Sequence, residues 1–297
     1  MATNPPPPTL DLLIVGALTI DRFADGSTAP GGSVLHGARG AARAGMRVGI
    51  VTVAGPEPQA RNGLEELRRL GWLHAEPAAA TVTFRHESLA GLRRLTLEVS
   101  AGQLVCPPAA VAPAAVLYAP VAGELDANLG GQLHEGAFAA ASLQGWLRRL
   151  EVGRAVEALP LRAVDSHLVA RLRRMDLLVL SREDLAASTS SAGPGGDQLD
   201  AIRALVGNDP LIALTDGLAG AHLDHRGSRM VVPAAGVVHE VPTVGAGDVF
   251  AALLAAFLAA RPRPFDLARA ADAARAAADG VVTMLEGRRE TSGRGSG

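Results

Sequence analysis

The chain contains no lysine, so all 28 of its basic residues are arginine. A P-loop NTPase needs the sequence G-x-x-x-x-G-K-[ST], and a protein kinase needs a strand lysine beside the phosphates of its nucleotide. The chain as it stands can belong to neither class. If it handles phosphorylated ligands, their negative charge must be balanced by arginine, a metal ion, helix N-termini or backbone N–H groups.

Aromatic residues are also scarce, at 3% of the chain, and the formal net charge is only −2. Nucleic-acid binding generally needs a basic face, and single strands are held by bases that stack on aromatic side chains. The sequence shows no basic stripe and few stacking groups. We therefore expect no nucleic-acid partner.

The chain has one cysteine, Cys106, and so can form no internal disulfide, which fits a reducing compartment. No apolar run reaches the roughly 18 residues that a membrane span needs. Residues 1–8 are rich in proline and lack the basic and apolar regions of a signal peptide. We therefore predict a cytoplasmic protein with no membrane partner. Residues 1–8 and 288–297 are predicted to be disordered tails.

What the chain does contain is a regular alternation of short apolar runs and helical segments. Hydrophobic residues make up 48% of the 297 residues, which is enough to bury a large core. Strands are predicted at 12–16, 47–53, 115–118, 177–180 and 211–215, and helices at 34–44, 63–70, 184–187, 198–205, 249–261 and 265–285. This order predicts an α/β fold with a doubly wound, mostly parallel sheet and helices on both faces. Residues 9–287 show no internal boundary and are predicted to form a single domain.

Residues 81–99 follow a different pattern. Apolar and polar residues alternate on both sides of Ala90-Gly91, which is typical of an antiparallel hairpin with one face in water. We predict that this hairpin protrudes from the α/β domain as a small β lid.

The segment Gly245-Ala246-Gly247-Asp248 lies between a β-rich stretch, 230–241, and an apolar helix. Its glycines allow successive N–H groups to point in one direction at a helix N-terminus, which favours anions such as phosphate. Asp248 is then placed to accept a proton from an attacking hydroxyl. The alternative interpretation is a tight turn in which Asp248 is an ordinary N-cap.

These four residues and the helix after them resemble the C-terminal signature of the ribokinase-like (PfkB) carbohydrate kinases. Further segments resemble that family in the same order, at 16–21, 31–36, 180–184 and 215–220 and at Asp272, so the resemblance spans roughly residues 11–287. It implies a kinase that uses ATP and Mg²⁺ and transfers the γ-phosphate to a hydroxyl of a sugar or polyol.

The resemblance also implies a role for each matched residue. Asp248 is the base, and the amides of Gly245, Ala246 and Gly247 stabilise the charge on the transferring phosphoryl group. The residues that hold the substrate are Asp21, Gly31, Gly32 and His36. The residues that hold the nucleotide are Ser181, Thr215, Gly217, Gly220 and Asp272. Asp184 supports Mg²⁺, through water.

Some positions depart from the family pattern. Pro242 stands where an acidic residue linked to a monovalent cation is usual, which argues against K⁺ activation. Ser181 and Asp184 replace Asn and Glu, and they also form a good helix-capping pair. His36 replaces a frequent Asn, and its ordinary interpretation is a packed histidine. The segment 22–32 is short, so the predicted lid consists of this arm and the hairpin at 81–99.

Residues 142–148 and 119–121 resemble a subgroup related to plant myo-inositol kinases, which favours an inositol-like polyol, although we derive no mechanism for 142–148 from the sequence. Two other functions stay open. One is a non-catalytic binding or regulatory protein with the ribokinase fold. The other is a nucleoside kinase, which the low aromatic content disfavours. The oligomeric state is open as well, and a homodimer is one option.

Overall fold

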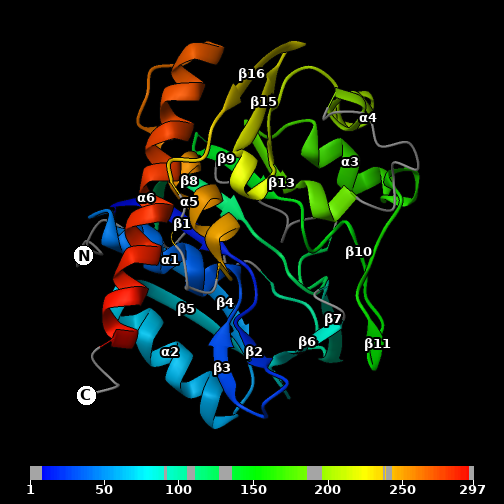
Figure 1. Ribbon diagram of the computed structural model, residues 1–297, viewed down its shortest axis with the longest axis vertical. Helices are drawn as coiled ribbons and strands as arrows, with labels where there is room; N and C mark the ends of the chain where they lie inside the picture. Colours follow the sequence, from blue (N-terminus) through cyan, green and yellow to red (C-terminus); the bar gives the residue numbers. More distant parts are fainter. Residues whose placement is uncertain are drawn as a thin grey trace, which may run out of the picture.

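The computed structural model describes residues 9–89, 92–105, 111–126, 136–185, 196–236, 238 and 243–293. Its main sheet has nine strands in the order β16-β15-β14-β13-β9-β8-β1-β4-β5 (Figure 1). These are β1 Thr9–Val15, β4 Val48–Ala54, β5 Gly71–Pro77, β8 Ala112–Tyr118, β9 Phe138–Ser142, β13 Leu177–Ser181, β14 Leu211–Thr215, β15 Ala221–His225 and β16 Ser228–Val232. The predicted doubly wound α/β fold is confirmed.

Within the main sheet, the seven strands β14, β13, β9, β8, β1, β4 and β5 pair in parallel. Strands β15 and β16 add an antiparallel edge next to β14. The chain winds outward from β1 through β4 to β5, and then from β8 to β14 on the other side of β1. The strand order therefore reverses between β1 and β8. In open α/β sheets, ligands bind at such a reversal, beyond the carboxyl ends of the strands.

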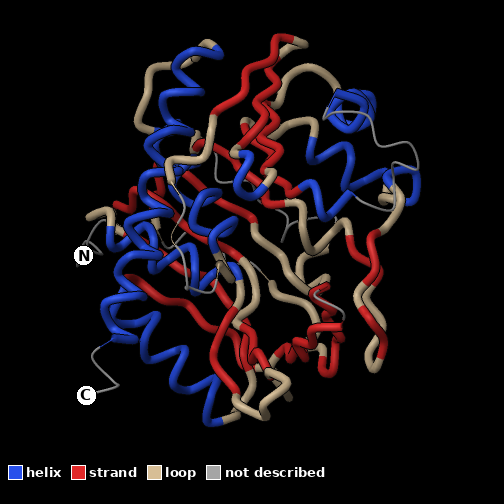
Figure 2. Tube along the Cα trace, in the orientation of Figure 1, coloured by secondary structure: helices blue, strands red, loops and turns tan. Residues whose placement is uncertain are grey.

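Helices cover both faces of the main sheet, as Figures 1 and 2 show. The helices are α1 Ser33–Arg43, α2 Pro58–Leu70, α3 Ser166–Leu172, α4 Gly196–Val206, α5 Ala246–Ala259 and α6 Leu267–Gly293. Alternate residues of β1 face opposite sides, since Leu12 and Ile14 lie in one buried cluster with α1, α2, α5 and α6, while Leu13 and Val15 lie in another with α3 and α4. The buried parallel strands are apolar throughout because both faces are covered.

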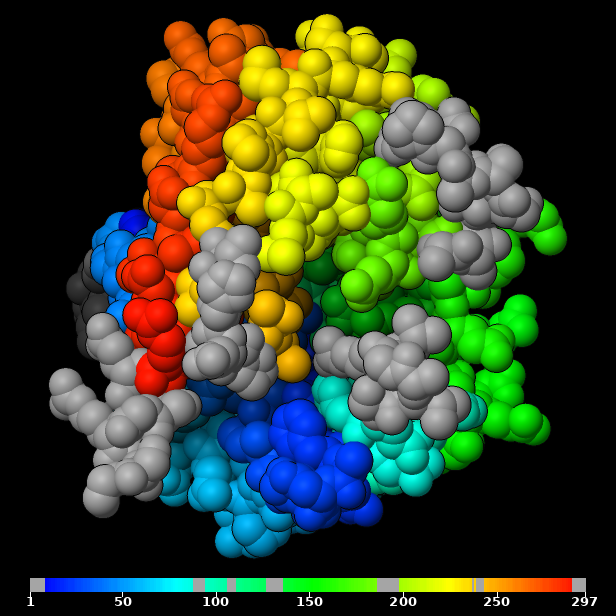
Figure 3. Space-filling view, in the orientation of Figure 1, coloured from blue at the N-terminus to red at the C-terminus, as the bar shows by residue number. Residues whose placement is uncertain are grey.

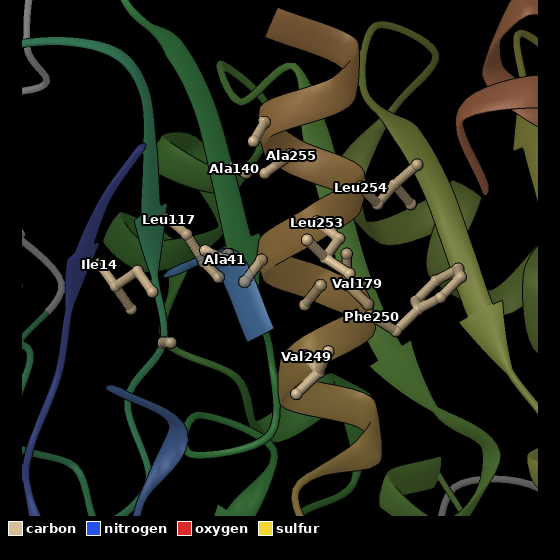
Figure 4. Close-up of a cluster of buried hydrophobic side chains, with 14 of the residues drawn as sticks. Ile14, Ala41, Leu117, Ala140, Val179, Val249, Phe250, Leu253, Leu254 and Ala255 are labelled. Atoms are coloured by element: carbon tan, nitrogen blue, oxygen red, sulfur yellow. The ribbon is translucent and has the colours of Figure 1, made fainter. Parts of the chain in front are cut away.

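Helix α5 is apolar on nearly every side because it lies between the sheet and its neighbours α1 and α6. Figure 4 shows Val249 and Leu253 of this helix in the same buried cluster as Ile14 and Leu117 of the sheet. Each fully buried side chain of this size contributes roughly 1.5–3 kcal/mol to the free energy of unfolding. The start of α5 is therefore held firmly at the carboxyl edge of the sheet.

A second sheet of five strands, in the order β11-β7-β6-β2-β3, lies beside the main one. Its strands are β2 Thr19–Arg22, β3 Thr28–Gly31, β6 Val82–Leu89, β7 Leu92–Val99 and β11 Arg154–Ala155. The antiparallel hairpin predicted at 81–99 is confirmed as β6 and β7. Strands β2 and β3 contain residues 22 and 28–31 of the predicted arm, and β11 was not predicted. A separate pair joins β10 Arg148–Arg149 to β12 Glu157–Ala158.

Several boundaries differ from the prediction. Helix α6 continues to Gly293, so the prediction of disorder from residue 288 is wrong for 288–293. The helix expected at 184–187 is a short 3₁₀ turn, Arg182–Leu185. Two further 3₁₀ turns lie at Leu161–Ala163 and Gly217–Ala219. Residues 1–8, Cys106, Pro242 and 294–297 lie outside the described residues. Within the described ranges, no helix combines the length and apolar character that crossing a bilayer requires.

Candidate active site

A cleft of about 630 Å³ lies along the carboxyl edge of the main sheet. Its floor is built from residues that end or follow four neighbouring strands, namely Val121 after β8, Gln144 after β9, Ser181 at the end of β13 and Thr215 at the end of β14. The starts of α1 and α5 and part of the second sheet complete its walls. In Figure 3 the same region is the hollow between the N-terminal and C-terminal parts of the chain.

The start of α5 lies in this cleft. Gly245 is the N-cap of the helix, with a φ of 81°, and a side chain there would place its Cβ 2.2 Å from the ring of His36. Both the backbone conformation and the space therefore require glycine. Asp248 lies three residues further on, inside the first turn, and so does not occupy the N-cap position. The interpretation of Asp248 as an ordinary N-cap is therefore wrong.

The amides at this helix start are not equivalent. The amide of Ala246 donates a hydrogen bond to the carbonyl of Thr243 at 3.0 Å. The amides of Gly247 and Asp248 belong to the first turn, where an α-helix offers no partner. The space beside Gly247 is open. An anion at this end of α5 would therefore meet two N–H groups and the positive end of the helix dipole.

Burial raises the pKa of the Asp248 carboxyl from 3.8 to about 6. The Ser33 hydroxyl and the Arg148 guanidinium oppose this rise, while the carboxylates of Asp184 and Asp21 add to it. At neutral pH the side chain is therefore ionised, yet more basic than an exposed aspartate. These are the properties that a general base needs.

Asp21, on β2, lies on the wall of the cleft that the second sheet provides and is 7% exposed. The hydroxyl of Thr19 donates to its Oδ1 at 3.3 Å, and Nε2 of His86 lies 3.2 Å from the same oxygen. A Cβ at Gly31 would lie 2.3 Å from Oδ2, so Gly31 makes room for this carboxylate and does not itself line the cleft. Gly32, the N-cap of α1, does line it.

His36 lies beneath the Gly245 turn. Burial, together with the charges of Arg39 and Arg288, lowers the pKa of this histidine to about 4. Nη2 of Arg288 is 3.5 Å from its Nδ1. The ring is therefore neutral at physiological pH and provides no positive charge for a phosphate.

The other end of the cleft begins at the turn after β13. The amide of Ser181 donates to Oδ2 of Asp184 at 3.0 Å, and the amide of Glu183 donates to Oγ of Ser181 at 3.1 Å. This is a reciprocal capping box, so the pair does stabilise its own turn. Burial also raises the pKa of Asp184. Asp184 and Glu183 both line the cleft.

The described residues contain no group of three or more side chains that would hold a metal ion unaided. Magnesium is commonly bound by one or two carboxylates together with phosphate oxygens and water. Asp184 and Glu183 fit that arrangement.

The comparisons with known proteins agree with this geometry. The family model described as "pfkB family carbohydrate kinase" matches residues 129–289, just over half of the chain. The chain belongs to the PfkB family of carbohydrate kinases. A comparison with curated protein sequences gives no match.

Solved structures show the same fold as this PfkB kinase at low sequence identity. A pyrophosphate-dependent kinase in the ribokinase family, complexed with a pyrophosphate analog and myo-inositol, is 18% identical, with a TM-score of 0.70 over 91% of this chain and 94% of that one. Fructokinase from Vibrio cholerae O395 with fructose, ADP and calcium is 20% identical, with a TM-score of 0.68 over 91% and 90%. An apo putative ribokinase II from E. coli is 16% identical, with a TM-score of 0.62 over 89% and 90%.

The PfkB kinase brings most of the predicted site residues to one cleft. Those that line it are Asp21, Gly32, His36, Ser181, Asp184, Thr215, Gly217, Gly220, Gly245, Ala246, Gly247 and Asp248. Asp272 does not, since it lies on the exposed side of α6 with Arg275 bound to it at 2.7 Å. The lining residues of α6 are Ala278, Val281, Val282 and Leu285, whose spacing selects another face of the helix. This corrects the prediction that Asp272 contacts the nucleotide.

Sequence reasoning missed Glu124. Its buried carboxylate accepts hydrogen bonds from the amides of Ala17 at 2.7 Å, Val121 at 3.0 Å and Ala122 at 2.8 Å. It thereby joins the turn after β1 to the loop after β8, at the reversal of strand order. A single glutamate in a loop carries no local sequence signal for this role, because the donor that makes it a link, the amide of Ala17, belongs to a segment far away in the sequence.

Proposed function

We propose that this PfkB kinase transfers the γ-phosphate of ATP to a hydroxyl of a sugar or an inositol-like polyol. One observation carries the proposal. Asp248, with a pKa of about 6, stands at the start of α5 in the same cleft as Asp21, although more than 220 residues separate the two in sequence.

In the proposed step, Asp21 holds the acceptor and Asp248 takes the proton of the reacting hydroxyl. A bond forms from that oxygen to the γ-phosphorus, and the bond from the phosphorus to the bridging oxygen breaks. ADP leaves with the electron pair. The amides of Gly247 and Asp248 stabilise the negative charge on the group in transfer. Mg²⁺, held by Asp184 and Glu183, would neutralise charge on the donor phosphates.

The donor end of the cleft supports a nucleotide over pyrophosphate. Its lining beyond the Gly217 turn is small and apolar: Leu218, Val232, Ala234, Ala235, Ala278, Val281, Val282 and Leu285. Such a slot fits an adenine ring. Pyrophosphate has no apolar part, so it would leave this slot unfilled.

The acceptor end of the cleft is polar and supports a polyol. Asp21, His86, Thr19 and the start of α1 supply hydrogen-bonding groups there. Among the described lining residues at this end, Phe84 is the only Phe, Tyr or Trp side chain, which gives a nucleobase little to stack on. The solved relatives with myo-inositol and with fructose have acceptors of the kind proposed here.

A coupled assay tests the proposal directly. ATP and inorganic pyrophosphate are each offered with hexoses, inositols and nucleosides, in the presence of Mg²⁺. We expect product only with ATP and with a sugar or inositol, and no dependence on K⁺. Product with pyrophosphate would overturn the donor assignment. No product with any pair, from protein that binds ATP and a polyol, would favour the non-catalytic binding protein instead.

A further inference from the structure

The segment from Ser142 to Arg148 is anchored along most of its length. The amide of Gly145 donates to the carbonyl of Pro120 at 3.0 Å, and the indole of Trp146 donates to the carbonyl of Leu125 at 2.9 Å. The amide of Leu147 donates to the carbonyl of Leu143 at 3.0 Å. The segment leaves the carboxyl end of β9, a central strand. Its last residue is therefore presented to the cleft in a fixed position.

Arg148 is 16% exposed and is the one arginine among the described residues that line the cleft. With the Gln144 amide assigned so that its oxygen faces Arg148, this oxygen accepts hydrogen bonds from Nη1 at 2.9 Å and Nη2 at 3.0 Å. Nη2 also lies 3.8 Å from Oδ1 of Asp184. The same guanidinium is close enough to Asp248 to oppose the rise in its pKa. Arg148 thus lies near both the carboxylate of the donor end and the base.

A purely structural role for Arg148 would be to neutralise Asp184. That ion pair is at the outer limit of contact, at 3.8 Å, and Asp184 already accepts a hydrogen bond from the Ser181 amide. The guanidinium takes its orientation from Gln144, which is neutral. A planar guanidinium is well suited to phosphate oxygens. Without any lysine in the chain, no other side chain offers the cleft a permanent positive charge within its described lining.

We propose that Arg148, oriented by Gln144, binds the transferring phosphoryl group between the donor and Asp248. This inference rests on the proposed function and adds a catalytic residue to it. The guanidinium stabilises the charge that spreads over the oxygens of that group, in addition to the amides of α5. Gln144 is a positioning residue that acts through Arg148.

The test compares Arg148→Gln and Arg148→Lys with Arg149→Gln. Arg149 is the next residue of β10, is 57% exposed in its side chain and does not line the cleft, so it is a matched control. With Arg148→Gln we expect kcat to fall about 10²-fold. Binding of the β,γ-imido analogue of ATP should weaken about tenfold, while binding of ADP changes less than about threefold. Arg148→Lys should fall between Arg148→Gln and wild type, and Arg149→Gln should match wild type.

The Asp184→Asn background distinguishes direct binding of the phosphoryl group by Arg148 from a role in which Arg148 only neutralises Asp184. If Arg148 acts only through Asp184, Arg148→Gln should have no effect in the Asp184→Asn protein, and that result would overturn the proposal. A kcat of Arg148→Gln within about threefold of wild type, or equal weakening of both nucleotides, would also overturn it. If wild type phosphorylates nothing, the proposed function fails. The comparison between the β,γ-imido analogue and ADP then still tests whether Arg148 binds the γ-phosphate. If the wild-type protein binds neither nucleotide, both the proposed function and the proposed role of Arg148 are overturned.

Discussion

The carboxylate of Asp248 sets the expected pH dependence of the reaction. A general base must be ionised, and burial raises the pKa of this group to about 6. We therefore expect kcat/KM to be constant above pH 7 and to fall about tenfold for each pH unit below 6. Steady-state rates between pH 5 and 8, with enzyme stability checked at each pH, measure this. A plateau that continues to pH 5 would contradict the pKa that is assigned to Asp248.

The buried carboxylate of Glu124 is expected to contribute to the stability of the fold. Glu124→Gln places an amide NH₂ where one carboxylate oxygen accepts backbone N–H groups, so at least one buried donor loses its partner. We expect a loss of about 2–3 kcal/mol in the free energy of unfolding. Chemical denaturation measures it, with Glu151→Gln on the exposed surface as the control. Equal midpoints for the two variants would show that Glu124 does not hold the two loops together.

Single residues differ in how far the sequence predicts them. Asp248 follows from a local pattern, because it stands beside glycines at the start of a helix, whereas Asp21 was predicted from the resemblance to the family. Arg148 begins β10 and Glu124 stands in a loop, and each has one partner from a distant segment, Asp184 for Arg148 and Ala17 for Glu124. Asp272 was wrongly placed because a helix of small residues has two similar faces, and only the tertiary packing decides which one meets the cleft.

Among the elements, α6 has a role that its composition hides. The Arg- and Gly-rich stretch after residue 285 suggests fraying, but the helix continues to Gly293, and Arg288 reaches the loop before α5. Nη1 of Arg288 donates to the carbonyl of Val244 at 2.8 Å, and its Nη2 lies beside His36. The end of α6 thus holds the turn that starts α5. The 81–99 hairpin was predictable from alternation and five strands of the main sheet from their apolar runs, whereas β5, β9 and this contact were not predicted.

We expect Arg288→Ala to lower kcat about tenfold, because small displacements of a catalytic group have large effects on rate. Thermal stability should change little, since Arg288 is only half-buried. The exposed Arg289→Ala is the matched control. Steady-state kinetics and a melting curve for each variant measure the two effects. An Arg288→Ala enzyme with wild-type kcat would mean that other contacts fix the Gly245 turn.

For the whole molecule, the second sheet provides a wall for a cleft whose floor belongs to the main sheet. His86 of β6 contributes to this wall through its contact with Asp21. If β6 and β7 act as a lid, donor and acceptor together should slow amide hydrogen exchange at 82–87 and 94–99. Exchange in β4, which is buried in the main sheet, serves as the reference. Unchanged exchange in both strands at saturation would exclude a lid role.

The account as a whole depends on Asp248 as the base, and Asp248→Asn tests it most directly. Because the folded pKa is raised, the ionised carboxylate opposes folding above pH 6, so the variant should be at least as stable as wild type at pH 7.5. Calorimetry should find ATP affinity retained, since the amides of α5 survive the change. We predict that kcat falls about 10²–10⁴-fold. A folded Asp248→Asn enzyme that turns over within about threefold of wild type would contradict the account.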